Sequence, residues 1–235
     1  MSPEQIVGKA LLNGLKMVSH ERIYQHVWED KKKGGTLYEQ LRAKGKCYRK
    51  RGALKDKRGI IPNRRHISDR PAVVEEKSRI GDLEIDTVIG KNHEGALVTI
   101  NDQKTNMVKI RKVNSKQAQD VKKATLDALA DWGFVKTITS DNGKEFAYHE
   151  QIAEAFDFYF ATPYHSWEFG ANENTNGLIR QYIPKQTNFG TITEQYVQYV
   201  EDELNNRPRK KHGSLTPNEV LLKKINQTEK VAFIT

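Results

Sequence analysis

From residue 79 onward the chain carries three short apolar segments in close succession, and their spacing restricts the fold more than any other feature. Residues 82–89, 96–101 and 106–113 are rich in Val, Ile and Thr and are separated by Gly, Asn, Asp and Lys. Segments of this length and composition are typical of β-strands. Connections this short join antiparallel strands, because a parallel pair needs a long crossover. The sequence therefore predicts an antiparallel three-stranded meander.

Helices and further strands alternate after this meander. The expected elements are a helix at 115–132, a strand at 135–139, a helix at about 145–156, a strand at 157–161 and a helix at about 170–183. A meander, then a helix, then alternating strands and helices is the element order of a ribonuclease-H-like fold, which retroviral integrases share. We therefore expect an α/β core of this class.

Residues 1–42 are expected to form helices that precede the core. Ser-Pro-Glu-Gln at 2–5 has the form of a capping box with proline at the first helical position. Two short helices around a Gly-containing turn fit a helix-turn-helix in which 19–29 is the recognition helix. In that interpretation Arg22 and Gln25 face outward and bind DNA. An ordinary helical hairpin fits the pattern equally well.

Basic residues are concentrated between these helices and the core. The net charge is +9, and residues 41–70 hold twelve Lys or Arg against two Asp, which leaves −1 for the rest of the chain. We interpret 43–78 as a basic linker that binds a polyanion, since neutralised phosphates release counterions. A solvated linker without a partner is the alternative. The linker residues expected to contact DNA are Arg49, Lys50, Arg51, Arg64 and Arg65.

Composition excludes several other classes of protein. Cys47 is the only cysteine, so an internal disulfide is excluded, and a structural zinc site is not expected without a Cys-x-x-Cys pair. No apolar run is long enough to span a bilayer, and the start has no secretory pattern. We therefore expect a soluble, intracellular protein with no membrane partner. We divide it into residues 1–42, 43–78 and 79–235, the last including C-terminal helices.

Three acids lie in separate segments of the predicted core. Asp86 falls within the first strand, Asp141 follows the fourth, and Glu173, 32 positions later, falls on the helix after the fifth strand. In this fold the three positions converge at one edge of the sheet. All-oxygen ligands suit two Mg²⁺ ions, with Mn²⁺ as a substitute, and such pairs serve phosphoryl transfer. Glu84 shares the strand face of Asp86 and competes with it as the first ligand. Singly, each acid is also typical of a turn or a solvated surface.

Neighbouring polar residues are expected to contact double-stranded DNA. Arg180 lies seven residues after Glu173, two helical turns on, so both side chains project from one face. A guanidinium there suits a DNA phosphate. The other candidates flank the acids in sequence and are Asn142, Lys144, Asn174 and Asn176.

Three longer motifs resemble the bacterial insertion-sequence transposases of the family numbered thirty. They are Ser-Asp-Asn-Gly-Lys-Glu-Phe-Ala at 140–147, Phe-Tyr-Phe-Ala-Thr-Pro-Tyr at 158–164, and the segment from Asn-Glu-Asn-Thr-Asn-Gly to Ile-Pro-Lys at 172–185. The likeness extends across nearly the whole chain.

This resemblance implies a cytoplasmic, nucleoid-associated DDE transposase with Asp86, Asp141 and Glu173 as metal ligands. It would hydrolyse the phosphodiester at the ends of a mobile element and join the freed 3′-hydroxyl to target DNA, a DNA recombination that integrates the element. A homodimer or higher oligomer on DNA is expected, because two ends are joined.

The chain departs from the family at several points, and two of them bear most on function. The interval between Asp141 and Glu173 is two residues shorter than usual, and the chain begins at the second of the family's helix-turn-helix regions, so we expect a shortened copy. The alternative function is therefore a non-catalytic DNA-binding remnant that inhibits the full enzyme or occupies element ends. A retroviral integrase is disfavoured because its amino-terminal zinc domain is missing, and a dedicated ribonuclease H by the helices and basic linker.

Overall fold

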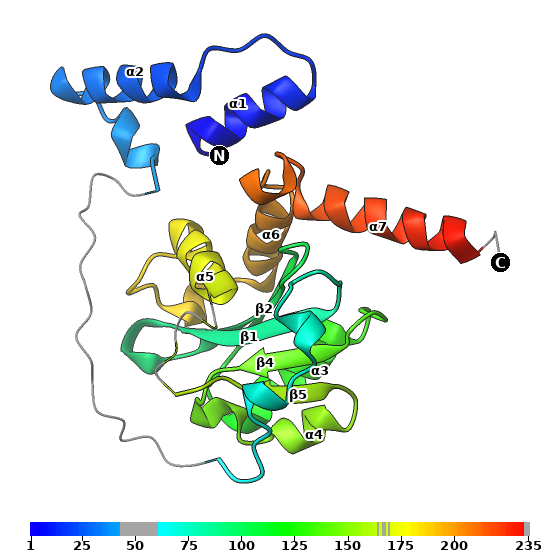
Figure 1. The fold of residues 1–235 in the computed structure, drawn as a ribbon. Coiled ribbons are helices and arrows are strands. Elements are labelled where there is room, and N and C mark those ends of the chain that lie inside the picture. Colours follow the sequence, from blue (N-terminus) through cyan, green and yellow to red (C-terminus); the bar gives the residue numbers. More distant parts are fainter. Residues whose placement is uncertain (43–60, 164, 166–167, 169, 233–235) are drawn as a thin grey trace. The chain divides into compact units, whose positions relative to one another are not determined.

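The computed structural model describes residues 1–42, 61–163, 165, 168 and 170–232 (Figure 1). Contacts within the chain divide it into two compact units. The larger one is Lys57–Asn205, and the smaller one joins Met1–Asp56 to Asn206–Thr235. None of the described helices is both long and apolar enough to cross a membrane.

The larger unit is built on a five-stranded sheet with the order β3-β2-β1-β4-β5. The strands are β1 (Asp82–Ile89), β2 (Ala96–Asp102), β3 (Val108–Val113), β4 (Thr137–Ser140) and β5 (Asp157–Phe160). β1, β2 and β3 pair antiparallel, whereas β4 is parallel to β1 and β5 to β4. This meander with two added parallel strands confirms the predicted ribonuclease-H-like topology.

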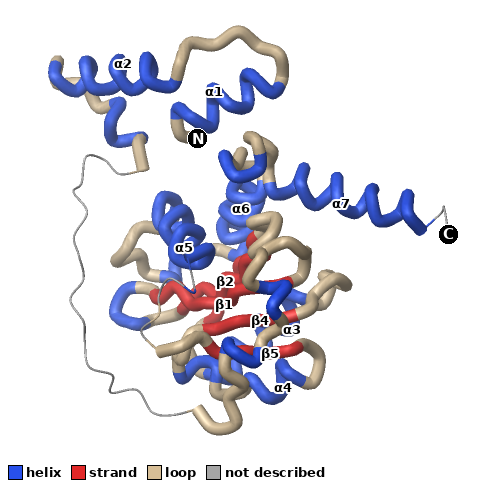
Figure 2. The backbone as a smooth tube through the Cα atoms, in the orientation of Figure 1, coloured by secondary structure: helices blue, strands red, loops and turns tan. Residues whose placement is uncertain are grey.

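Four helices cover the two faces of this sheet (Figure 2). They are α3 (Ala118–Leu129), α4 (His149–Ala153), α5 (Gly170–Tyr182) and α6 (Glu194–Asn205). α5 and α6 pack on one face of β1, β2 and β3, and α3 packs with α4 on the other side. Alternate strand residues such as Val88 and Leu97 enter the apolar core under α5 and α6 together with Leu178 and Val200.

Side chains of α6 close the exposed edge of β3. Asn205 Oδ1 accepts a hydrogen bond from the Val108 N–H, and Asn205 Nδ2 donates one to the Val108 carbonyl, both at 2.8 Å. Glu201 Oε2 accepts the Ile110 N–H at 2.7 Å. Unpaired backbone groups on an edge strand invite pairing with other chains. The helix therefore supplies hydrogen-bond partners for backbone groups of β3 that have none within the sheet.

Asn205→Ala is expected to lower the free energy of unfolding by roughly 2–4 kcal/mol, because both backbone groups of Val108 lose their partners. Urea titration followed by circular dichroism measures this. Gln198→Ala is the matched control, since Gln198 is exposed on the same helix. Equal stability of the two variants would contradict the assigned role of Asn205.

Part of the expected basic linker packs against the sheet. Ile61, Ile67 and Val74 are buried, and the Phe160 N–H donates to the Arg65 carbonyl at 2.9 Å. The few aliphatic residues of this segment therefore fix it beside β5. The larger unit begins at Lys57, upstream of the boundary expected at residue 79.

The smaller unit joins the two ends of the chain. It contains α1 (Pro3–Leu12), with the predicted capping box, α2 (His20–Lys32), capped by Ser19, and α7 (Pro217–Ala232). Lys9 Nζ lies 2.6 Å from Glu219 Oε1. Placing everything to residue 235 in the core therefore differs from the contacts, which assign Asn206 onward to the first helices.

The helix-turn-helix remains a prediction. The connection between α1 and α2 covers 13–19. It is longer than the helix-turn-helix turn of about three to four residues.

Candidate active site

The register of two parallel strands makes Asp86 and Asp141 neighbours. Ile85 on β1 is paired with Ser140, the last residue of β4, so Asp86 is the next residue of β1 and Asp141 is the first residue after β4. Residues at matched positions of parallel strands project from the same face of a sheet. The charge of Asp141 disfavours the ionised form of Asp86 and raises its pKa. The predicted meeting of these two acids at one edge is therefore present in the structure.

The carboxyl group of Asp86 sits in an environment that disfavours its charge. Burial, followed by the charges of Asp141 and Glu145, raises its pKa from 3.8 to about 7. Two hydrogen bonds act in the opposite direction, from the Thr87 N–H to Oδ1 and from Asn176 Nδ2 to Oδ2, each at 2.7 Å. A cation beside this pair would offset both the cost of a buried negative charge and the repulsion between the carboxylates.

Glu173 lies on α5 with its side chain exposed. It precedes Asn176 by three residues, which places the two on neighbouring positions of the helix surface. Among the described residues, no three His, Cys, Asp or Glu side chains are grouped closely enough to hold a metal ion. The expected meeting of all three acids is thus seen for two of them.

Glu145 is a fourth acid at this edge, and the sequence analysis missed it. Its carboxylate is buried, lies 2.7 Å from Lys116 Nζ and accepts a hydrogen bond from Thr87 Oγ1 at 2.9 Å. A 3-10 turn at Lys144–Phe146 folds the chain back toward β1. The signal was its position four residues after Asp141, within the same motif. No feature of the sequence indicated that Lys116 would pair with Glu145, because the two residues are far apart in the chain.

Gly143 allows the close approach of Asp141 and Glu145. Its N–H donates to Asp141 Oδ1 at 2.9 Å. A Cβ atom at this position would lie 2.3 Å from Glu145 Oε2, which is far inside van der Waals contact. A side chain here would have to displace the Glu145 carboxylate from Thr87 and Lys116.

Gly143→Ala is therefore expected to displace Glu145, to lower the free energy of unfolding by about 1–3 kcal/mol and to disturb the Asp141 turn. Thermal unfolding and a strand-cleavage assay measure the two effects. Gly133→Ala is the matched control, because a Cβ there meets nothing within 4 Å. If both variants behave like the wild type, the close approach has no energetic importance.

Known proteins resemble this chain along nearly its whole length. A transposase for insertion sequence element IS4351 from Bacteroides fragilis is 56% identical over 235 residues, which is 99% of the chain and 72% of that protein. The transposase InsI for insertion sequence element IS30C from Escherichia coli is 30% identical over 242 residues, covering 97% of the chain and 63% of that protein. The chain belongs to this family of insertion-sequence transposases. The predicted resemblance is confirmed.

No protein-family model matches the chain. The catalytic core domain of BIV integrase is a similar solved structure, with a TM-score of 0.49 and 18% identity over 63% of the chain and 98% of that core domain.

Several residues predicted to bind DNA make hydrogen bonds within this transposase. Asn142 is buried, accepts a hydrogen bond from Arg64 and donates one to the Ala161 carbonyl at 2.7 Å. Arg180 donates to the Ile89 carbonyl at 2.8 Å, and burial lowers its pKa. Asn176 binds Asp86. These contacts shape the site, and contact of these three residues with DNA stays a prediction.

The remaining candidates are exposed or lie outside the described residues. Arg65 forms an ion pair with Asp157 at 2.7 Å, and its Cζ lies 4.5 Å from the centre of the Tyr159 ring. Its guanidinium group is therefore bound by residues of the chain itself. The exposed candidates are Lys144, Asn174, Arg22 and Gln25, the last two being hydrogen-bonded to each other. Arg49, Lys50 and Arg51 fall within 43–60, which the structure does not describe.

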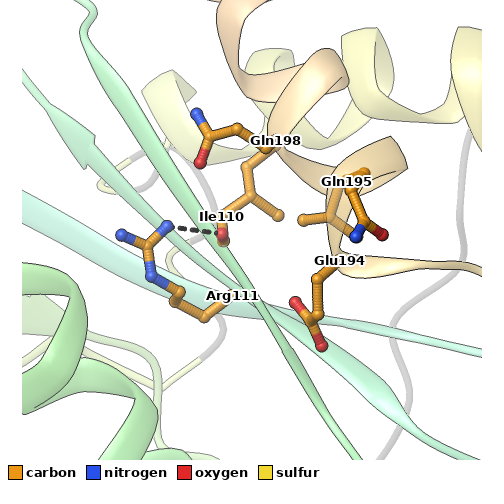
Figure 3. A pocket seen from close by; sticks show the side chains of 6 residues that line it. Ile110, Arg111, Glu194, Gln195 and Gln198 are labelled. Atoms are coloured by element: carbon orange, nitrogen blue, oxygen red, sulfur yellow. Dashed lines mark hydrogen bonds between the residues drawn. The ribbon is translucent and has the colours of Figure 1, made fainter.

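A separate cavity of about 300 Å³ lies between β3 and α6 (Figure 3). Its polar lining includes Arg111, Glu194 and Gln198. None of the acids at the β1–β4 edge lines it, so it is distinct from the candidate active site.

Proposed function

We propose that the chain cleaves DNA at the ends of an insertion sequence and joins the freed 3′-hydroxyl to target DNA, using divalent metal ions. The observation that carries this proposal is the position of Asp86 on β1 beside the end of the parallel strand β4, where Asp141 follows directly, with the pKa of Asp86 raised to about 7 by burial and by the charge of Asp141. Membership of the transposase family supports the reaction class.

The residues at this edge fit hard divalent cations. Carboxylate oxygens are the ligands that Mg²⁺ and Mn²⁺ prefer, and Mg²⁺ keeps several of its waters, so few protein ligands are enough. Asp86, Asp141 and Glu173 would hold two such ions. When bound, the ions polarise the scissile phosphate and help ionise the attacking water or hydroxyl.

The other residues of the edge orient these acids. Asn176 and the Thr87 N–H each fix one oxygen of Asp86, and the Gly143 N–H fixes one oxygen of Asp141. Lys116 balances the charge of Glu145 next to the pair. Each hydrogen bond restricts the rotation of a ligand, which lowers the cost of arranging the site for phosphoryl transfer.

Double-stranded DNA is the proposed partner. Lys144 is exposed three residues after Asp141, where an ammonium group suits a phosphate of the bound strand. The exposed Arg22 and Gln25 of α2 would contact DNA separately. Because two element ends are joined in one reaction, we propose at least a dimer on DNA.

The test uses the whole purified chain with a labelled duplex that carries an element end and a second duplex as target. Nicked and joined products are expected with Mg²⁺ or Mn²⁺ and not with EDTA. Binding of the duplex without any strand chemistry under all conditions would overturn the proposal. That result would favour the alternative of a non-catalytic DNA-binding protein.

A further inference from the structure

The interface between α5 and the sheet is apolar at one end and polar at the other. Val88 and Leu97 pack against the later turns of the helix. At its first turns, Glu84 and Asn101 of the sheet and Asn172 of the helix are 0%, 0% and 1% exposed. Fully buried polar side chains cost free energy unless they are paired, so such a group under a helix start needs a specific reason.

Glu84 contacts the backbone of the helix itself. Its Oε2 accepts the N–H of Asn172 at 3.0 Å. Asn172 is the third residue of α5, which starts at Gly170, and the first four N–H groups of a helix have no partner within the helix. A carboxyl group at this end also interacts favourably with the helix dipole. Glu84 therefore ties the first turn of α5 to β1.

A second tie lies one turn further along the helix. Asn176 Nδ2 donates to Asp86 Oδ2 at 2.7 Å, and Thr99 Oγ1 donates to Asn176 Oδ1 at 3.2 Å. Asn172 and Asn176 are four residues apart, so both ties reach the sheet from one side of α5. Glu173 follows the first tie directly and precedes the second, which fixes its backbone from both directions.

We propose that Glu84 is a positioning residue, which holds the first turn of α5 so that Glu173 is presented to the Asp86–Asp141 pair. This inference rests on the proposed function for the role of Glu173. It assigns Glu84 a place in the structure distinct from that of a metal ligand. Glu84 supplies an oxygen at the right distance to accept the Asn172 N–H. Its negative charge contributes less to holding the helix than this hydrogen bond does.

Two conservative variants separate reach from charge. Glu84→Gln keeps an oxygen at the same distance from the backbone and removes the charge. Glu84→Asp keeps the charge and withdraws the oxygen by one methylene, about 1.5 Å. We expect kcat for strand cleavage to stay within about threefold for Glu84→Gln and to fall at least about tenfold for Glu84→Asp, with unchanged DNA affinity. The reverse order would show a ligand or charge role and overturn the inference.

Hydrogen exchange of the metal-free protein gives a readout that does not depend on activity. Glu84→Asp is expected to accelerate amide exchange in the first turn of α5, at Asn172 above all, by at least about tenfold. Exchange in β1 and β2 should stay slow, and Glu84→Gln should resemble the wild type. Unchanged exchange at Asn172 in Glu84→Asp would overturn the inference while the proposed function stands.

Glu201→Gln is the matched control, because Glu201 is also a buried carboxylate that accepts a strand N–H, that of Ile110. It should lower stability and leave both kcat and exchange in α5 unchanged. If cleavage does not require Asp141, the proposed function fails. The exchange experiment then still decides whether Glu84 holds the helix.

Discussion

Asp141→Asn is expected to reduce DNA cleavage and joining by a factor of at least about 10³, because a ligand that holds a catalytic cation contributes several kcal/mol to the transition state. The substitution keeps the size of the side chain, and its Oδ1 can still accept the Gly143 N–H. The fold and the affinity for element-end DNA should therefore be preserved. Single-turnover cleavage rates and fluorescence anisotropy with the same duplex measure the two quantities.

Asp131→Asn is the control for Asp141→Asn, since Asp131 is an exposed acid of the same unit beyond the end of α3. It should leave the rate unchanged. Residues that act as one unit are not additive, so Asp86→Asn with Asp141→Asn should be no slower than the slower single variant. Wild-type rates for Asp141→Asn would remove Asp141 from the active site.

The strands and the pairing of two acids could be predicted because they depend on local pattern and strand register. β1 has the predicted limits, and the place of Asp141 directly after β4 follows from where the apolar run ends. Only a few registers of β1 against β4 place Asp86 beside Asp141, and strand register is set by the hydrophobic pattern. This part of the site is encoded in alternation, strand length and turn residues.

Side-chain partners could not be predicted, because they join residues far apart in the chain. Arg64 binds Asn142 across 78 positions, and Glu84 accepts the Asn172 N–H across 88. The sequence showed Glu84 on the face of Asp86 but not that a helix start would lie over it. A long side chain reaches several neighbours, and packing decides among them.

The smaller unit shows the same limit at the level of domains. Local capping predicted the start of α1, and α7 begins in the same way, with the Glu219 N–H donating to Thr216 Oγ1 at 3.1 Å. The ion pair between Lys9 and Glu219 spans 210 positions and has no local signature. Helix ends are set by nearby residues, whereas the partner of a helix is set by surfaces that form only in the folded chain.

Asp86→Asn is expected to stabilise the metal-free protein above neutral pH, even though it should abolish activity. The folded carboxyl has a pKa of about 7, against 3.8 for its ordinary value. Between these values unfolding releases a proton, so the stability that Asp86 contributes is complete below about pH 4 and is lost as the pH rises to 7. The loss corresponds to roughly 4 kcal/mol at most. Urea titrations in EDTA should show the variant gaining over the wild type across this range, with a constant difference above it.

Added Mn²⁺ should reverse this order at pH 8. A cation that binds the folded wild type stabilises it by mass action and offsets the repulsion between Asp86 and Asp141, whereas the variant retains one carboxylate of the pair and gains less. At pH 5 the proton on Asp86 competes with the cation, so the stabilisation of the wild type should shrink. Asp131→Asn should follow the wild type throughout. An Asp86→Asn protein that is no more stable than the wild type at pH 8 in EDTA would show that the edge carries no strain from its acids, and the argument for a cation there would lose its electrostatic basis.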